Sequence, residues 1–194
     1  MQPQQTPTPT AQSNPLLRLI VKYGVIMGLA FCTYTLLMWI TRLDSTYLAY
    51  GQYLDIAIIA LPVTVIFIAI TKARKQLGLT VGKRLLLAIG IGLLSYLIYH
   101  PFQYVYHEYI NPDWFESVVD LKSMGMEQSG TASEEIAEAV AEMRAQNANQ
   151  SGLFSFGPFV SSVLILPALI ALLSLIFIRG KHSSPQDKNP LHAG

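Results

Sequence analysis

Residues 85–104 have the sequence LLLAIGIGLLSYLIYHPFQY, which contains no Lys, Arg, Asp or Glu. A helix of about 20 apolar residues covers the ~30 Å hydrocarbon core of a lipid bilayer. Inside hydrocarbon the backbone must satisfy its own hydrogen bonds, and an unbroken helix does so. This block therefore predicts a membrane-spanning helix, which we place at residues 85–106 because the apolar and aromatic sequence continues slightly further.

Three other apolar blocks are long enough to cross a bilayer as helices. They cover residues 19–40, 54–70 and 158–178. Strands of a membrane barrel have about ten residues of alternating polarity, and these blocks are longer and continuous. The sequence therefore predicts an all-α fold, an integral membrane four-helix bundle over residues 16–180. Residues 1–15, rich in Gln, Pro and Thr, are expected to form a disordered tail, and residues 181–194 a cytoplasmic tail.

The overall composition agrees with a membrane protein and excludes several other classes. Hydrophobic residues make up 52% of the chain and charged residues 13%, about half the charged fraction of a typical soluble domain. The net charge of +1 gives no reason to expect a nucleic-acid partner. Cys32 is the single cysteine, so an intrachain disulfide and a zinc site with two cysteines are both excluded.

The distribution of basic residues predicts the orientation in the membrane. With four crossings, ten of the 13 Lys and Arg residues fall on one side, and eleven of the 12 acidic residues fall on the other. The side richer in Lys and Arg is normally cytoplasmic. We therefore expect both termini, and the loop between the second and third blocks, to lie in the cytoplasm.

The polar segment between the third and fourth blocks is predicted to be a small extracytoplasmic helical hairpin over residues 112–148. Asn111 is a candidate N-cap, followed by Pro112 at the first helical position, for a helix ending near Met124. Gly125 and Gly130 are expected to break the chain. The spacing of Thr131 and Glu134 is that of a capping box, which predicts a second helix ending near Asn147.

A narrow apolar stripe follows the second of these helices, at Ile136, Val140 and Met143. One interpretation is an amphipathic helix that lies on the membrane surface or on its own bundle. The rest of the helix is acidic and fits an anionic lipid surface poorly. Of these two locations, contact with the bundle is therefore favoured. The other interpretation is an interaction face for a partner helix.

The aromatic end of the third block contains the candidate metal ligands His100, His107 and Glu108. Two imidazoles and a carboxylate can bind a metal ion or relay protons. However, a spacing of seven residues separates the two imidazoles by about 10 Å along an ideal helix. The alternative is an interfacial belt of Tyr and His side chains. No catalytic motif is recognisable, so we expect neither an enzyme nor a bound cofactor.

Two further features bear on packing and transport. Gly24 and Gly28 form a G-x-x-x-G pair, whose small residues allow membrane helices to approach closely within a bundle or a homo-oligomer. Asp55 is the acidic residue at the edge of a predicted membrane block, and no charge lies near the centre of any block. Ion-coupled transporters usually carry such a central charge, so the pattern disfavours transport.

The run Tyr106-His107-Glu108-Tyr109-Ile110-Asn111-Pro112-Asp113, together with the Gly-, Met-, Ser- and Glu-rich stretch from Met124 to Ile136, resembles a bacterial family of membrane proteins. This is domain-of-unknown-function family 4199, whose members are similar to this chain from about Leu16 to Arg179. The shared pattern is a Tyr-rich end of the third helix, an Asn-Pro-Asp turn and an acidic segment before the last helix. The resemblance implies a bacterial inner-membrane location and implies no activity.

These features predict a non-enzymatic, multi-pass inner-membrane protein that acts through protein contacts, as an accessory subunit or an envelope sensor. Its expected partners are the lipid bilayer and another membrane or periplasmic protein. The alternatives are a small transporter or channel and, less favoured, a metal-dependent membrane enzyme.

Overall fold

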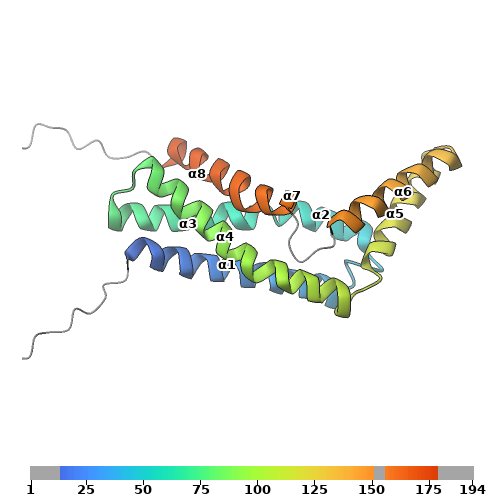
Figure 1. Ribbon diagram of the computed structural model, residues 1–194, viewed down its shortest axis with the longest axis horizontal. Helices are drawn as coiled ribbons and strands as arrows, with labels where there is room; N and C mark the ends of the chain where they lie inside the picture. Colours follow the sequence, from blue (N-terminus) through green and yellow to red (C-terminus); the bar gives the residue numbers. More distant parts are fainter. Residues whose placement is uncertain (1–13, 151–155, 179–194) are drawn as a thin grey trace, which may run out of the picture.

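A computed structural model describes residues 14–150 and 156–178, and every regular element in these ranges is helical. This confirms the all-helical prediction for the described part of the chain. The predicted tails fall almost wholly outside it. The helices are α1 (Pro15–Ile40), α2 (Leu48–Ala57), α3 (Ala60–Leu77), α4 (Val81–Val105), α5 (Trp114–Gln128), α6 (Ser133–Gln150), α7 (Phe156–Phe159) and α8 (Leu166–Phe177), with π-helical segments η1 (Tyr106–Ile110) and η2 (Val160–Ile165) (Figure 1).

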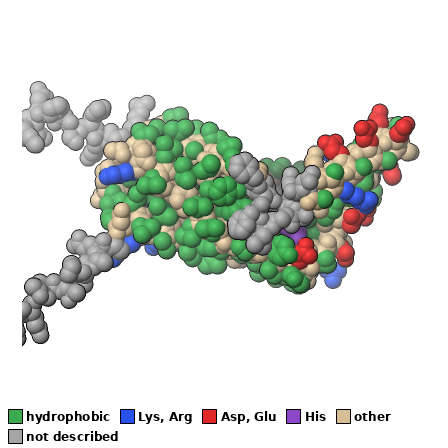
Figure 2. Space-filling model, in the orientation of Figure 1, with side chains coloured by type: hydrophobic (Ala, Val, Ile, Leu, Met, Phe, Trp, Pro, Cys, Tyr) green, Lys and Arg blue, Asp and Glu red, His purple; other side chains and the backbone are tan. Residues whose placement is uncertain are grey.

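By length and composition, three helical segments of the described chain could cross a membrane. They are Pro15–Ile40, Val81–Ile110 and Val160–Phe177, and about a third or less of each apolar window is buried inside the protein. The outward-facing remainder is also apolar, with Leu29 55%, Leu86 56% and Ile176 63% exposed. Figure 2 shows hydrophobic side chains covering this part of the visible surface. Water would solvate such a surface poorly, so it is suited to lipid.

The second predicted block differs in its boundaries from the structure. Instead of one helix over residues 54–70, the chain forms α2 and α3, with Ile58 and Ile59 between them. The helical part starts earlier, at Leu48, and continues through Lys72, Arg74 and Lys75 to Leu77. The prediction used apolarity alone, and a helix can continue past the end of an apolar block wherever its backbone bonds continue. A left-handed Gly78 (φ 58°) ends α3, as glycine commonly does after a helix.

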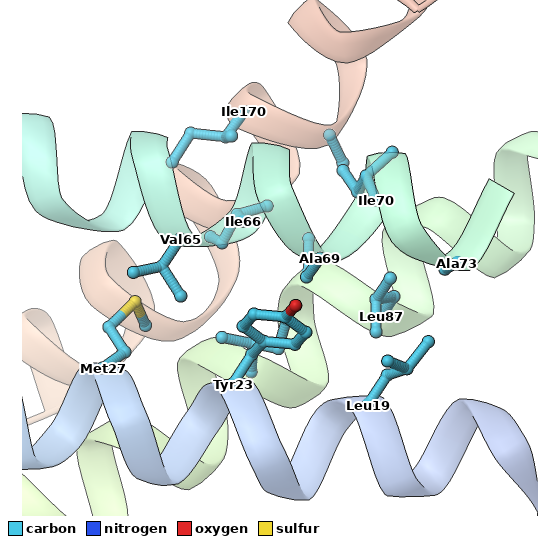
Figure 3. Packing of buried hydrophobic residues seen from close by; sticks show 13 residues of the cluster. Leu19, Tyr23, Met27, Val65, Ile66, Ala69, Ile70, Ala73, Leu87 and Ile170 are labelled. Carbon is cyan, nitrogen blue, oxygen red and sulfur yellow. The ribbon is translucent and has the colours of Figure 1, made fainter. Parts of the chain in front are cut away.

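The buried core is formed by residues from α1, α3, α4 and α8, called the core helices below. In α1 the buried side chains Leu19, Tyr23 and Met27 recur every four residues and so share one face. They meet a matching face of α3 that includes Ile66 and Ile70, both fully buried (Figure 3). The other members of the cluster are Val65, Ala69, Ala73, Leu87, Ala88, Ile91, Ile170 and Ala171.

Small residues bring α1 and α4 close together. A Cβ atom added at Gly24 would lie 2.8 Å from Leu94 Cβ, and one added at Gly28 would lie 2.9 Å from Ile98 Cβ. Real Cβ atoms do not approach one another so closely, so both positions need the absence of a side chain. The structure thus places this glycine pair in the contact between two helices of the same chain.

A buried arginine joins the beginning of α4 to the end of α8. The Arg84 guanidinium, on a side chain only 5% exposed, donates hydrogen bonds to the carbonyl oxygens of Ser174 (3.2 Å) and Ile178 (3.0 Å). Ser174 O also accepts a hydrogen bond from Ile178 N at 2.8 Å, whereas the carbonyl of Ile178 lies beyond the last helical residue, where helix carbonyls lack intrahelical donors. A cation at this end of a helix is favourable. Arg84 therefore has a structural function in addition to its contribution to the basic loop.

The α5–α6 pair (residues 114–150) extends from one end of the core helices (Figure 1). The two helices contact each other, and Arg144 of α6 forms an ion pair with Glu116 of α5 (2.8 Å). The predicted ends were too early: α5 continues through Gly125 to Gln128 rather than ending near Met124, and α6 continues to Gln150 rather than ending near Asn147. A single glycine costs a helix about 1 kcal/mol, which neighbouring contacts can offset. The break occurs at Gly130, where φ is +79°.

We predict that Gly24→Ala destabilises the protein by about 1–3 kcal/mol, the usual cost of adding a methyl group to a tightly packed interface. The measurement is the unfolding midpoint of the purified protein in mild detergent. Gly82→Ala is the control, because a Cβ at Gly82 meets no atom within 4 Å. Since alanine is a better helix former than glycine, the control should be neutral or slightly stabilising. Equal effects of the two substitutions would contradict the close α1–α4 contact.

Candidate functional site

A buried polar cluster lies where the core helices meet the α5–α6 pair. Its members are Asp44, in the loop after α1, Tyr106, the first residue of η1, and Asn111, in the turn before α5. Tyr106 donates a hydrogen bond from its hydroxyl to Asp44 Oδ2, and Asn111 Nδ2 donates to the same oxygen at 3.0 Å. Asp44 is 6% exposed and Tyr106 2%. A carboxyl group that accepts two hydrogen bonds in so buried a place is held in a defined position.

The local backbone explains how these three residues meet. After α1, Arg42 has a left-handed backbone (φ 58°), and Tyr47 N donates to Arg42 O at 2.9 Å, closing a compact loop that carries Asp44 inward. At the end of η1, Asn111 N donates to Tyr106 O at 2.8 Å. This wider π-type closure places the Asn111 side chain beside the Tyr106 hydroxyl, at 3.1 Å.

Asn111 does not cap α5, contrary to the sequence prediction. The helix begins at Trp114, with Asp113 in the N-cap position and no side-chain capping hydrogen bond. The Asn111 amide donates instead to Asp44 and Tyr106. A buried carboxylate without hydrogen-bond donors costs more free energy than an exposed helix end that water can solvate. The Asn111 amide therefore stabilises the protein more by donating to Asp44 than by capping α5.

A cavity of about 350 Å³ lies beside this cluster, between the ends of α1 and α4 and the beginnings of α2 and α5. Its lining is strongly aromatic and contains one acidic residue. The lining residues are Tyr34, Thr35, Met38, Asp44, Leu48, Tyr99, Gln103, Tyr106, His107, Trp114 and Val118. We call it the outer cavity.

A second cavity, of about 290 Å³, lies deeper among the core helices and is mostly apolar. Both cavities are lined by Tyr34, Tyr99 and Gln103, so the two are adjacent. At this boundary the Tyr99 hydroxyl lies 3.0 Å from Thr35 Oγ1 and accepts a hydrogen bond from Gln103 Nε2 at 3.0 Å. We call this second space the inner cavity.

The candidate metal ligands are separated by this arrangement. His100 lines the inner cavity and stacks on Tyr96 with ring centroids 4.7 Å apart. His107 lines the outer cavity and packs against Trp114, also at 4.7 Å. Within the described residues, no three His, Cys, Asp or Glu side chains are grouped so that they could hold a metal ion. Both imidazoles pack against aromatic rings.

The apolar stripe of α6 is less exposed than the acidic positions around it. Ile136, Val140 and Met143 are half-buried, whereas the neighbouring Glu134, Glu135, Glu138 and Glu142 are exposed. The principal packing partner of α6 is α5. The stripe therefore lies on the less exposed side of α6, and the exposed surface of the pair is acidic.

Sequence reasoning did not single out Asp44 and the outer cavity. The carboxylate belongs to a short loop, and its partners Tyr106 and Asn111 follow more than 60 residues later. Two features of the sequence could have pointed to this site. Asp44 follows directly after an apolar block, and Asn111 follows directly after an aromatic run. Asn111 was predicted as a helix N-cap, and Tyr106 was noted only as part of the aromatic run.

The helical elements and their apolar outer surface define a protein with membrane-type helices, and comparison with known families makes this more specific. The model of the family described as "Protein of unknown function (DUF4199)" matches residues 22–179. The chain belongs to this family. No curated protein and no solved structure gives a significant match.

We predict that Tyr106→Phe destabilises the protein by about 1–3 kcal/mol, because it removes one of two described donors to the buried Asp44 carboxyl group. The loss should appear as a lower unfolding midpoint and as faster hydrogen exchange in the 41–47 loop. Tyr104→Phe is a matched control, since Tyr104 is 38% exposed. A Tyr106→Phe protein as stable as this control would show that the cluster does not hold the loop in place.

Proposed function

We propose that this chain is a non-enzymatic protein of the bacterial cytoplasmic membrane that crosses the bilayer four times and binds a basic partner protein through its α5–α6 pair. The observation that carries the proposal is the acidic, exposed surface of this pair, which extends from the core helices (Figure 2). Such a protein acts as an accessory subunit or an envelope sensor.

The fourth crossing in this proposal is formed by α2 and α3 together. The three candidate spans do not include α3, which has three basic residues near its end. However, α3 contributes fully buried side chains to the same core as α1, α4 and α8. A helix packed among membrane-spanning helices shares their environment, and terminal basic side chains can extend to the headgroups.

The positions of the helix ends support an orientation with both termini in the cytoplasm. The beginning of α1, the α3–α4 turn and the end of α8 lie at one end of the core helices, and the α5–α6 pair extends from the other (Figure 1). Lys72, Arg74, Lys75 and Lys83 lie near the first end. Residues 112–148 contain eight acidic and two basic residues. The positive-inside rule then assigns the α5–α6 pair to the extracytoplasmic side.

This topology predicts that a cysteine in the α5–α6 turn reacts with reagents outside the cell. Ser129, which is exposed, is replaced by Cys in a Cys32→Ala background, and intact cells are treated with a membrane-impermeant thiol reagent. Ser129→Cys should be labelled. A cysteine at Gln76, which is exposed near the end of α3, should be labelled only after lysis. The opposite pattern in folded protein would reverse the orientation and make the partner cytoplasmic.

The surface chemistry of the α5–α6 pair indicates the kind of partner. The half-buried stripe of α6 lies on its less exposed side, so a partner would meet mainly carboxylates. Complementary charge speeds encounter and selects the partner, and salt weakens it. A protein with a basic surface is therefore the expected occupant, rather than an apolar helix.

We predict that charge reversal on α6 abolishes cross-linking to that partner. A photoreactive residue replaces the exposed Ala145 in the full chain, and cells are irradiated at low and high salt. Replacing Glu134, Glu135, Glu138 and Glu142 by Lys should remove the cross-linked product. The control variant, Ala137→Gln with Ala141→Gln, changes exposed positions of the same helix without changing charge. Its cross-linking should be retained.

The proposal fails if no specific product forms at low salt. It also fails if the charge-reversed and control variants form the product equally. A product with a basic protein that is lost on charge reversal and weakened by salt supports it. Helical content measured by circular dichroism should be the same in both variants, so that loss of folding is excluded as the cause.

A further inference from the structure

We propose that the outer cavity binds a small organic cation, a substituted ammonium whose positive charge is surrounded by apolar groups. The inference is independent of the proposed partner at the α5–α6 pair. It rests on the volume, the lining and the position of the cavity.

The lining combines a carboxylate with aromatic rings. Asp44 supplies the acidic group, held by Tyr106 and Asn111. Around it the lining includes the rings of Tyr34, Tyr99, Tyr106 and Trp114, and the described lining contains no Lys or Arg. The negative faces of aromatic rings attract cations, and this attraction strengthens as water is removed. A buried carboxylate with several aromatic rings is therefore complementary to an ammonium group with apolar substituents.

The same lining disfavours other classes of ligand. A metal ion needs several ligating side chains, and the described residues form no such group. An anion would meet the Asp44 carboxylate without a compensating cation in the described lining. A purely apolar ligand would place the Asp44 carboxyl group against apolar atoms, which is unfavourable for a buried polar group.

Size and position are also suitable. A volume of about 350 Å³ lies at the lower end of the range for small-molecule sites. The cavity lies where the core helices meet the α5–α6 pair, and Leu48 of α2 and Val118 of α5 both line it. A bound cation would therefore contact both parts of the molecule.

The experiment measures binding of choline to the purified full-length protein in phosphatidylglycerol nanodiscs. The chain has two Trp residues, so in a Trp39→Phe background the fluorescence reports on Trp114 in the cavity wall. We expect a saturable change with choline. The neutral analogue of choline, in which carbon replaces nitrogen, should bind at least about tenfold more weakly, because it lacks the charge that the rings and the carboxylate attract.

Two variants and a control locate the site. Asp44→Asn should weaken choline binding by about tenfold or more, and Tyr34→Leu by about three- to tenfold. Asp113→Asn removes an exposed acid near the same end of the molecule and should leave binding unchanged. If Asp44→Asn fails to fold, Tyr34→Leu decides. Equal responses to choline and its neutral analogue would overturn the proposal, as would no response to choline or equal losses in Asp113→Asn and in the cavity variants.

A second lipid composition distinguishes a soluble cation from a lipid headgroup with the same chemistry. In phosphatidylcholine nanodiscs a headgroup that enters the cavity would occupy it, and free choline would no longer change the Trp114 fluorescence. A retained response would identify a soluble cation as the ligand. Both results support the cation site, because in both the charged group is bound at the same residues.

Discussion

The close contact between α1 and α4 is the constraint on which most of the structure depends. Membrane helices gain little from apolar burial against each other, because lipid is equally apolar, so they associate through close packing. Gly24 and Gly28 permit that packing against Leu94 and Ile98. The same contact sets Thr35 of α1 beside Tyr99 of α4. Both cavities lie along this pair of helices, so their shape follows from the spacing that the glycines allow.

Beyond the ends of α1 and α4, the chain is held together by a polar cluster rather than by close apolar packing. Asp44, Tyr106 and Asn111 connect the loop after α1 to the end of α4 and the turn before α5. A buried carboxyl group with hydrogen-bonding partners specifies position more precisely than apolar contact, because its donors must be at defined distances and angles. These hydrogen bonds fix the orientation of the α5–α6 pair together with the packing of α5 on α2 and of Trp114 on His107, whereas the core depends on many small contacts.

The sequence predicted well what depends on local composition. Apolar blocks identified the helices Pro15–Ile40, Val81–Val105 and Leu166–Phe177, because hydrophobicity over about 20 residues is a strong signal. Boundaries were less accurate, since Lys72 and Arg74 lie within a helix and Asn111 serves a buried carboxylate instead of a helix end. The outer cavity could not be predicted, because Asp44 and Trp114 become neighbours only through the packing of distant segments.

The bond from Arg84 to the end of α8 has a consequence for the order in which the protein is made. Ser174 follows Arg84 by 90 residues, so its carbonyl emerges from the ribosome long after α4 has been synthesised. Until then the guanidinium must be solvated by water or by lipid headgroups. Docking of the last helix is therefore the step that withdraws this charge from solvent. A chain that ended before residue 174 would lack both carbonyl acceptors of Arg84, so this buried charge is compensated only when the last helix is complete.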